Sequence, residues 1–285
     1  MKKRRYVYYL QKTLFYLAIL FIVVIVMGPY LWMISGSFKT PIEIQAMEPT
    51  WIPSTFTLDN YRDMNRTVPI LKFFKNSLII SLGTMIVTVV IGTLAAYSIS
   101  RFRFRGRNAY QLSLFSTQML PGILFLIPYF VMFTWIKNTL GIPMTNTYHG
   151  MIFTYTSFSL PFSIIMLRNY LDSVPREIDE QAMIDGCSRV KALFKVILPL
   201  AKPGIAAVGI YSFIMAWNEI LFAMVLTRTE TRTISIGLLQ YITSNQAHWG
   251  QMMAACIMTT IPVIVLFTLM QKHIVQGLVS GATKG

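Results

Sequence analysis

Long apolar stretches alternate with polar segments along the 285 residues of the chain. An α-helix needs about 20 predominantly apolar residues to cross the hydrocarbon core of a bilayer. The pattern therefore predicts an all-α membrane protein with six transmembrane helices in a single domain covering residues 1–285. The expected spans are residues 13–36, 76–100, 108–136, 148–167, 203–227 and 248–271.

The composition agrees with this class of protein. Hydrophobic residues make up 54% of the chain and charged residues 13%, whereas soluble domains have about 25% charged residues. Of the 25 lysines and arginines, 17 fall in segments that share one side of the membrane if the N-terminus is cytoplasmic. Cytoplasmic loops carry such an excess, so we expect both termini in the cytoplasm and residues 272–285 to form a cytoplasmic tail.

Residues 101–107 contain four arginines interleaved with phenylalanines. Arginine and aromatic side chains together can bind nucleic acid through phosphates and stacked bases. In a short loop between two apolar spans, the favoured interpretation is instead that the arginines fix the orientation at the lipid headgroups. We therefore expect the lipid bilayer as a partner, and no nucleic acid.

The stretch between the fourth and fifth spans, residues 168–202, is polar and carries four charges in the five residues 176–180. Its apolar residues recur at helical spacing and the pattern breaks at Gly186, which predicts two short helices meeting near Asp185 and Gly186. A solvated amphipathic helix pair on a membrane protein favours docking to a soluble partner. A connecting loop without a partner is the alternative.

This segment resembles the EAA loop of permease subunits in ABC importers. The matching positions are Glu180, Ala182, Asp185, Gly186, Leu198, Pro199 and Pro203. The chain departs from the family pattern at Gln181 and Cys187. The resemblance implies a type I ABC importer permease, with Glu180, Ala182, Asp185, Gly186, Leu198 and Pro199 coupling the chain to ATPase subunits.

A second string, around Trp217, Asn218 and Glu219, is similar to the Trp-Asn-Glu motif of the carbohydrate branch of these permeases. With Phe222 it implies a translocation pathway or a permease interface, in which the aromatic rings could stack on sugars. An acid within a span is unfavourable in lipid, so Glu219 should face protein or a wet cavity. Helical spacing rotates Glu219 by about 100° from Asn218, and we expect Glu219 to tie helices together and Asn218 to lie nearer the cavity.

The resemblance also implies the partners: a second homologous permease, two ATPase subunits that hold ATP and Mg, and an external solute-binding protein. Residues 229–242 resemble a loop that reaches into the binding protein, and the expected contacts are Thr229, Glu230, Thr231 and Arg232. The location implied is the bacterial plasma (inner) membrane.

We expect no cofactor, metal or catalytic site on this chain. The sequence has no phosphate-binding P-loop, and its two cysteines and three histidines are scattered. The function that the resemblance implies is import of a sugar or oligosaccharide by alternating access. The alternatives are a permease for another solute, such as a peptide, and a membrane-embedded enzyme.

Overall fold

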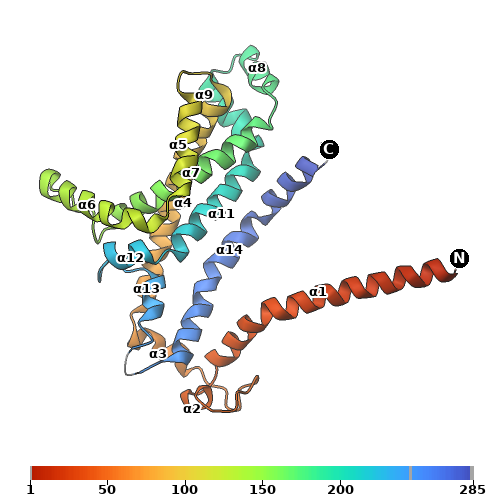
Figure 1. The fold of residues 1–285 in the computed structure, drawn as a ribbon, viewed down its shortest axis with the longest axis vertical. Coiled ribbons are helices and arrows are strands. Elements are labelled where there is room, and N and C mark those ends of the chain that lie inside the picture. The colour runs from red at the N-terminus through yellow and green to blue at the C-terminus, as the bar shows by residue number, and fades with distance from the viewer. Residues whose placement is uncertain (1, 244–245, 283–285) are drawn as a thin grey trace. The chain divides into compact units, whose positions relative to one another are not determined.

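The computed structural model describes residues 2–243 and 246–282, which are helical apart from turns, loops and one isolated bridge between Ile242 and Ala247 (Figure 1). The longer helices are α1 (Lys2–Ser37), α4 (Ile70–Arg101), α5 (Arg107–Met119), α6 (Leu126–Leu140), α7 (Tyr148–Asp172), α11 (Lys202–Asn218) and α14 (Trp249–Ala282). The shorter ones are α2 (Pro41–Ile44), α3 (Asp59–Thr67), η1 (Gly122–Phe125), α8 (Glu177–Ile184), α9 (Arg189–Ala192), η2 (Leu193–Ile197), α10 (Leu198–Leu200), α12 (Leu221–Leu226) and α13 (Ile234–Leu239).

Among the described residues, five helical segments are long and apolar enough to cross a membrane, and a bent pair brings the number to six if it counts as one span. The five are Tyr8–Ser37, Ile70–Arg101, Gly122–Leu140, Tyr148–Asp172 and Trp249–Lys272. The bent pair is Arg189–Leu200 with Lys202–Asn218, at an angle of 78°. The prediction of an all-α membrane protein is confirmed.

The stretch 108–136, expected as one span, divides into α5, η1 and α6. The break falls where Leu120 is extended, with φ −87° and ψ 130°, immediately before Pro121. The proline ring disfavours helical backbone in the residue that precedes it. The structure therefore turns the chain at this point instead of continuing α5.

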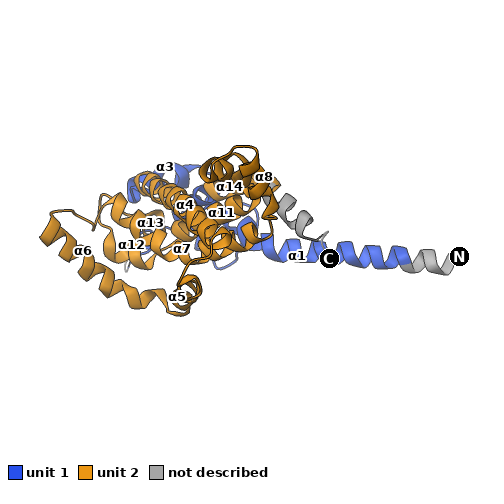
Figure 2. Ribbon diagram, turned by 90° about the horizontal axis from the view of Figure 1, so that it is seen from above, with its two compact units in different colours: residues 1–70, 238–260 blue, residues 71–237, 261–285 orange. Residues whose placement is uncertain are grey.

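The contacts within the chain divide it into two compact units, coloured separately in Figure 2. The expectation of a single domain stays a prediction. Unit 1 comprises residues 1–70 and 238–260. Its centre is the buried Asn60, whose side-chain amide donates to the carbonyl oxygens of Ser37 (3.0 Å) and Lys39 (2.8 Å). Gly250 packs against the same amide, and a Cβ at position 250 would lie 2.4 Å from the Asn60 Oδ1 atom. The buried Tyr241 hydroxyl donates to the Met64 carbonyl oxygen at 2.7 Å.

Unit 2 comprises residues 71–237 and 261–285, of which 283–285, the end of the expected tail, lie outside the described residues. One apolar cluster, which includes Ile99, Leu167 and Ile197, packs α4 and α7 against the helices that precede α11. A second cluster, with Phe133 and Phe222 in it, packs α6, α7 and α12. These two clusters position the charged segment 168–202 and the Trp-Asn-Glu string.

Candidate functional site: the coupling helices and the Glu219 cavity

The charged segment forms α8 and α9, joined by a tight turn at Gly186, so the prediction of two short helices is confirmed. Gly186 has φ +82°, its N–H donates to the Met183 carbonyl oxygen, and the Cys187 N–H donates to the Ala182 carbonyl oxygen. This pair of bonds is the Schellman ending of a helix, in which a left-handed glycine satisfies the last carbonyl groups. The turn therefore depends on the glycine at position 186.

Part of the helix pair is buried and part is exposed. Ala182 is buried, whereas Glu180, Asp185, Gly186 and Pro199 are exposed and Leu198 is half-buried. Large apolar side chains are also exposed on α8, on α9 and on η2, which follows them, and they are Met183, Ile184, Val190 and Phe194. Ile184 alone is 84% exposed. Large apolar side chains exposed on a highly charged segment favour an interaction surface.

A buried ion pair fixes this helix pair to the end of α4. The Arg101 Nε atom lies 2.8 Å from the Asp179 Oδ2 atom, and the two side chains are 6% and 12% exposed. Arg101 also donates to the Val174 carbonyl oxygen at 3.1 Å, and Arg176 donates to the Ser100 carbonyl oxygen at 2.8 Å. The sequence interpretation gave Arg101 only an orienting role and gave Asp179 none. The sequence did contain one indication that Asp179 is buried: it lies three residues before Ala182, which places both on the same face of a helix.

The string around Glu219 differs from the expectation of an uninterrupted helix over 203–227. Helix α11 ends at Asn218, and Glu219 has extended backbone, with φ −70° and ψ 132°. Its carboxylate accepts the N–H groups of Phe222 (2.9 Å) and Ala223 (3.0 Å) and so caps α12. An acidic side chain that binds nearby backbone N–H groups competes with continuation of the helix. Glu219 therefore lies outside α11, and the rotation of about 100° expected between consecutive residues of one helix does not describe Asn218 and Glu219.

Glu219 nevertheless bonds to a neighbouring helix, as predicted, because the Tyr155 hydroxyl of α7 donates to its Oε2 atom at 2.8 Å. Trp217 is 4% exposed and stacks on Phe213 at a centroid distance of 5.4 Å. Phe222 is also 4% exposed. Both rings are therefore almost completely buried, and one face of Trp217 is covered by Phe213.

A cavity of about 290 Å³ lies beside Glu219. Its described lining includes Gln118, Tyr155, Tyr211, Glu219 and Phe222 but neither Asn218 nor Trp217. Asn218 is exposed, and its place near a pathway stays a prediction.

The expected binding-protein contacts lie on a segment held by two asparagines. The Asn76 amide donates to the carbonyl oxygens of Glu230 (2.8 Å) and Arg232 (3.0 Å). The Asn146 Oδ1 atom accepts from the Thr231 hydroxyl at 3.0 Å, which leaves Thr231 2% exposed. Thr229 and Glu230 are exposed, so they form the accessible tip of this segment. Sequence reasoning missed both asparagines, and no local pattern marks them.

Among the described residues, no group of three or more His, Cys, Asp and Glu side chains could hold a metal ion.

The membrane-spanning helices, with the solvated pair α8 and α9 between α7 and α11 in the chain, have the architecture of a type I ABC importer permease. Comparisons identify the family. Residues 88–280 match the model of the binding-protein-dependent transport system inner membrane component, and the chain belongs to this family.

The chain is similar over nearly its full length to two curated proteins. It is 35% identical to the inner membrane ABC transporter permease protein YcjP of Escherichia coli (strain K12), over 97% of this chain and 98% of that protein. It is 36% identical to the trehalose/maltose transport system permease protein MalG of Thermococcus litoralis, over 97% and 98% of the two chains.

A solved structure shares the fold. The match is a chain of a bacterial ABC transporter involved in the import of the acidic polysaccharide alginate. The TM-score is 0.77 at 21% identity, covering 92% of this chain and 96% of that chain.

Proposed function

We propose that this permease subunit carries a neutral sugar or small oligosaccharide, delivered by an external solute-binding protein, into a bacterial cell. The observation that supports the substrate class most directly is the near full-length similarity to a relative named for trehalose and maltose. The Trp-Asn-Glu string agrees with it. A non-sugar solute, such as a peptide, is the competing function, and the test below separates the two.

In this proposal both termini and the segment 168–202 lie in the cytoplasm of a cell with the chain in its inner membrane. A second homologous permease pairs with it, and two ATPase subunits hold ATP and Mg. The exposed face of α8 and α9, with Glu180, Asp185 and Gly186, docks into an ATPase subunit. The apolar side chain of Ile184 would be buried there, since full burial of an isoleucine stabilises an interface by about 1.5–3 kcal/mol.

Movement of the docked helices would reach the spans by two routes. The first is the buried pair of Arg101 and Asp179, which joins α8 to α4. The second is the continuous run from α9 through Pro199 into α11, with its 78° bend. Both routes lead to helices of unit 2, in which the Glu219 cavity lies. The chain would thus convert closure of the ATPase subunits into alternating access at that cavity.

The test uses the assembled transporter in nanodiscs with its binding protein. ATP hydrolysis is measured with the binding protein and one solute at a time: maltose, trehalose, diacetylchitobiose or a tripeptide. We expect at least one neutral sugar to stimulate hydrolysis and the peptide to leave it at the basal rate. Stimulation by the peptide alone would reject the sugar assignment and leave the transporter class intact.

A further inference from the structure

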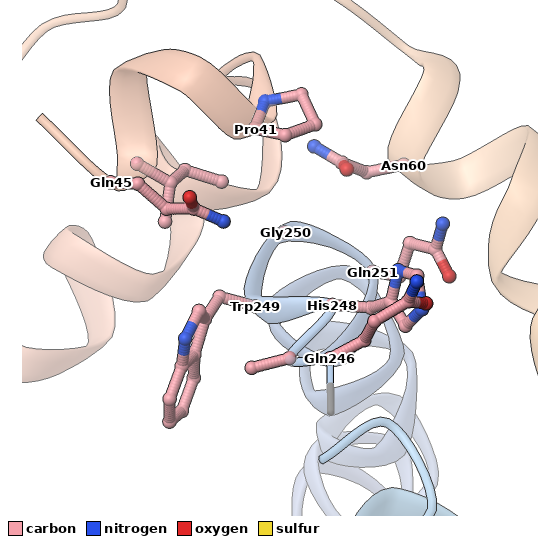
Figure 3. A pocket seen from close by; sticks show the side chains of 10 residues that line it. Pro41, Gln45, Asn60, Gln246, His248, Trp249, Gly250 and Gln251 are labelled. Atoms are coloured by element: carbon pink, nitrogen blue, oxygen red, sulfur yellow. The ribbon is translucent and has the colours of Figure 1, made fainter. Parts of the chain in front are cut away.

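A pocket of about 460 Å³ lies within unit 1, where α14 begins. Its walls come from α2 and the residue that follows it, from Asn60 of α3 and from residues 246–251, as Figure 3 shows. Binding sites for small molecules have volumes of about 300–1,000 Å³. The pocket therefore has room for a ligand of one or two sugar rings, and it involves none of the residues assigned above to coupling or to the Glu219 cavity.

The polar groups of this pocket are neutral amides with one histidine and one tryptophan. The side chains are Gln45, Asn60, Gln246, His248, Trp249 and Gln251. Among the described residues that line it there is no Lys, Arg, Asp or Glu. A charged ligand would lose its hydration here without gaining an opposite charge. Each amide presents both a donor and an acceptor, which suits hydroxyl groups, since a hydroxyl also donates and accepts.

One of these amide oxygens lacks a hydrogen-bond partner. The Gln251 Oε1 atom is buried and has no hydrogen-bond partner among the described residues. Buried polar atoms are paired in the great majority of cases, and an exception calls for an explanation such as a ligand or water. The Oε1 atom is shielded from solvent in this structure, so a hydroxyl group in the pocket would donate to it after the Gln251 side chain, which lines the pocket, rotates toward it.

The part of the wall formed by Asn60 is already ordered. The two hydrogen bonds from Asn60 to the carbonyl oxygens of Ser37 and Lys39 hold its amide in place. Trp249, 42% exposed, adds an aromatic ring that carries a donor N–H group. A rigid wall lowers the entropy lost on binding.

We propose that this pocket is a binding site for a neutral mono- or disaccharide, separate from the Glu219 cavity. Gln251 accepts a hydroxyl proton of the sugar, and Trp249 packs against the edge of its ring. Ordered water alone would satisfy Gln251 with far less volume, because a water molecule occupies about 30 Å³.

The experiment follows the melting temperature of the full chain in nanodiscs during titration with maltose, trehalose, diacetylchitobiose or glucuronate. Gln251→Leu removes the orphaned oxygen, and Gln240→Leu is the matched control because Gln240 belongs to unit 1 but does not line the pocket. We expect a saturable rise with at least one neutral sugar in the wild-type chain and in Gln240→Leu, and none with glucuronate. Gln251→Leu should melt at or above the wild-type temperature without sugar, since it removes an unpaired acceptor, and should need at least about tenfold more sugar.

Three results would overturn the proposal: a wild-type chain that responds to none of the neutral sugars, Gln251→Leu titrating like the wild type, or glucuronate acting as maltose does. A response that requires the external binding protein would also overturn it and would make the pocket a protein contact. The test is independent of the proposed transport function. A chain that binds sugar at Gln251 in a transporter that moves only peptides would refute the transport proposal and keep this one.

Discussion

Gly186 connects the two coupling helices, and its substitution tests whether the geometry of this turn transmits the ATPase movement. With φ +82° the residue is in the left-handed region, which costs a residue with a Cβ roughly 1–2 kcal/mol. A Cβ added at position 186 meets no atom within 4 Å. Backbone strain is therefore the whole expected effect of Gly186→Ala.

A penalty of 1–2 kcal/mol shifts the equilibrium between the intact and the opened turn by about 5–30-fold. Gly186→Asn should have a smaller effect, because asparagine tolerates the left-handed region better than alanine does. Gly186→Pro should have the largest, because proline fixes φ near −65° and removes a backbone N–H, here the one donated to the Met183 carbonyl oxygen.

The assay measures sugar uptake and ATP hydrolysis together in vesicles that contain the assembled transporter. Uptake per ATP hydrolysed should fall in the order glycine, asparagine, alanine, proline at position 186. Gly141→Ala is the control, because Gly141 has φ +70° and equally open surroundings but lies outside the coupling helices. It should destabilise the chain comparably and leave uptake per ATP unchanged. Normal coupling in Gly186→Pro, or equal uncoupling in Gly141→Ala, would show that the turn at Gly186 does not transmit the ATPase movement.

Further substitutions test the other parts of the site. Glu219→Ala should lower the stability of the chain by about 0.5–2 kcal/mol, the usual loss for a helix cap, measured by thermal unfolding in nanodiscs; an unchanged melting temperature would contradict the capping role. Asn76→Ala should weaken stimulation of the ATPase by the loaded binding protein, because the tip at residues 229–230 loses its anchor. Lys72→Gln should not, because the ion pair between the Lys72 Nζ and Glu230 Oε2 atoms (2.9 Å) is exposed and such a pair contributes only about 0–1 kcal/mol; equal effects would argue against the anchor. Arg101→Met and Asp179→Leu should each destabilise the chain by about 3–5 kcal/mol by leaving a buried charge unpaired. The double variant should recover much of that loss, and strictly additive losses would show that the two charges are not coupled.

Local patterns predicted much of this structure because helices and turns depend on neighbouring residues. The apolar runs, the helix pair and the break at Gly186 all follow from residues within a few positions of one another. The pair of Arg101 with Asp179 could not be found this way, because its members are far apart in the chain and meet only through tertiary packing. The same holds for Asn76 and its contacts with the segment after Thr229.

Glu219 shows a different limit of prediction from local sequence patterns. Its position in an apolar stretch correctly indicated a polar partner, which is Tyr155. The expectation of an uninterrupted helix was wrong because the carboxylate binds the N–H groups of Phe222 and Ala223 and starts a new helix instead. An acid followed by apolar residues is compatible with both outcomes, and the choice depends on the contact with α7.

The most direct test of the account is ATP-driven uptake of a radiolabelled neutral sugar into vesicles containing this chain, its partner permease, the ATPase subunits and the loaded binding protein. We expect sugar to accumulate inside only when ATP is supplied on the side that carries α8 and α9, and we expect Gly186→Pro to abolish accumulation while the complex still assembles. Accumulation without ATP, or with this chain left out of the complex, would contradict it.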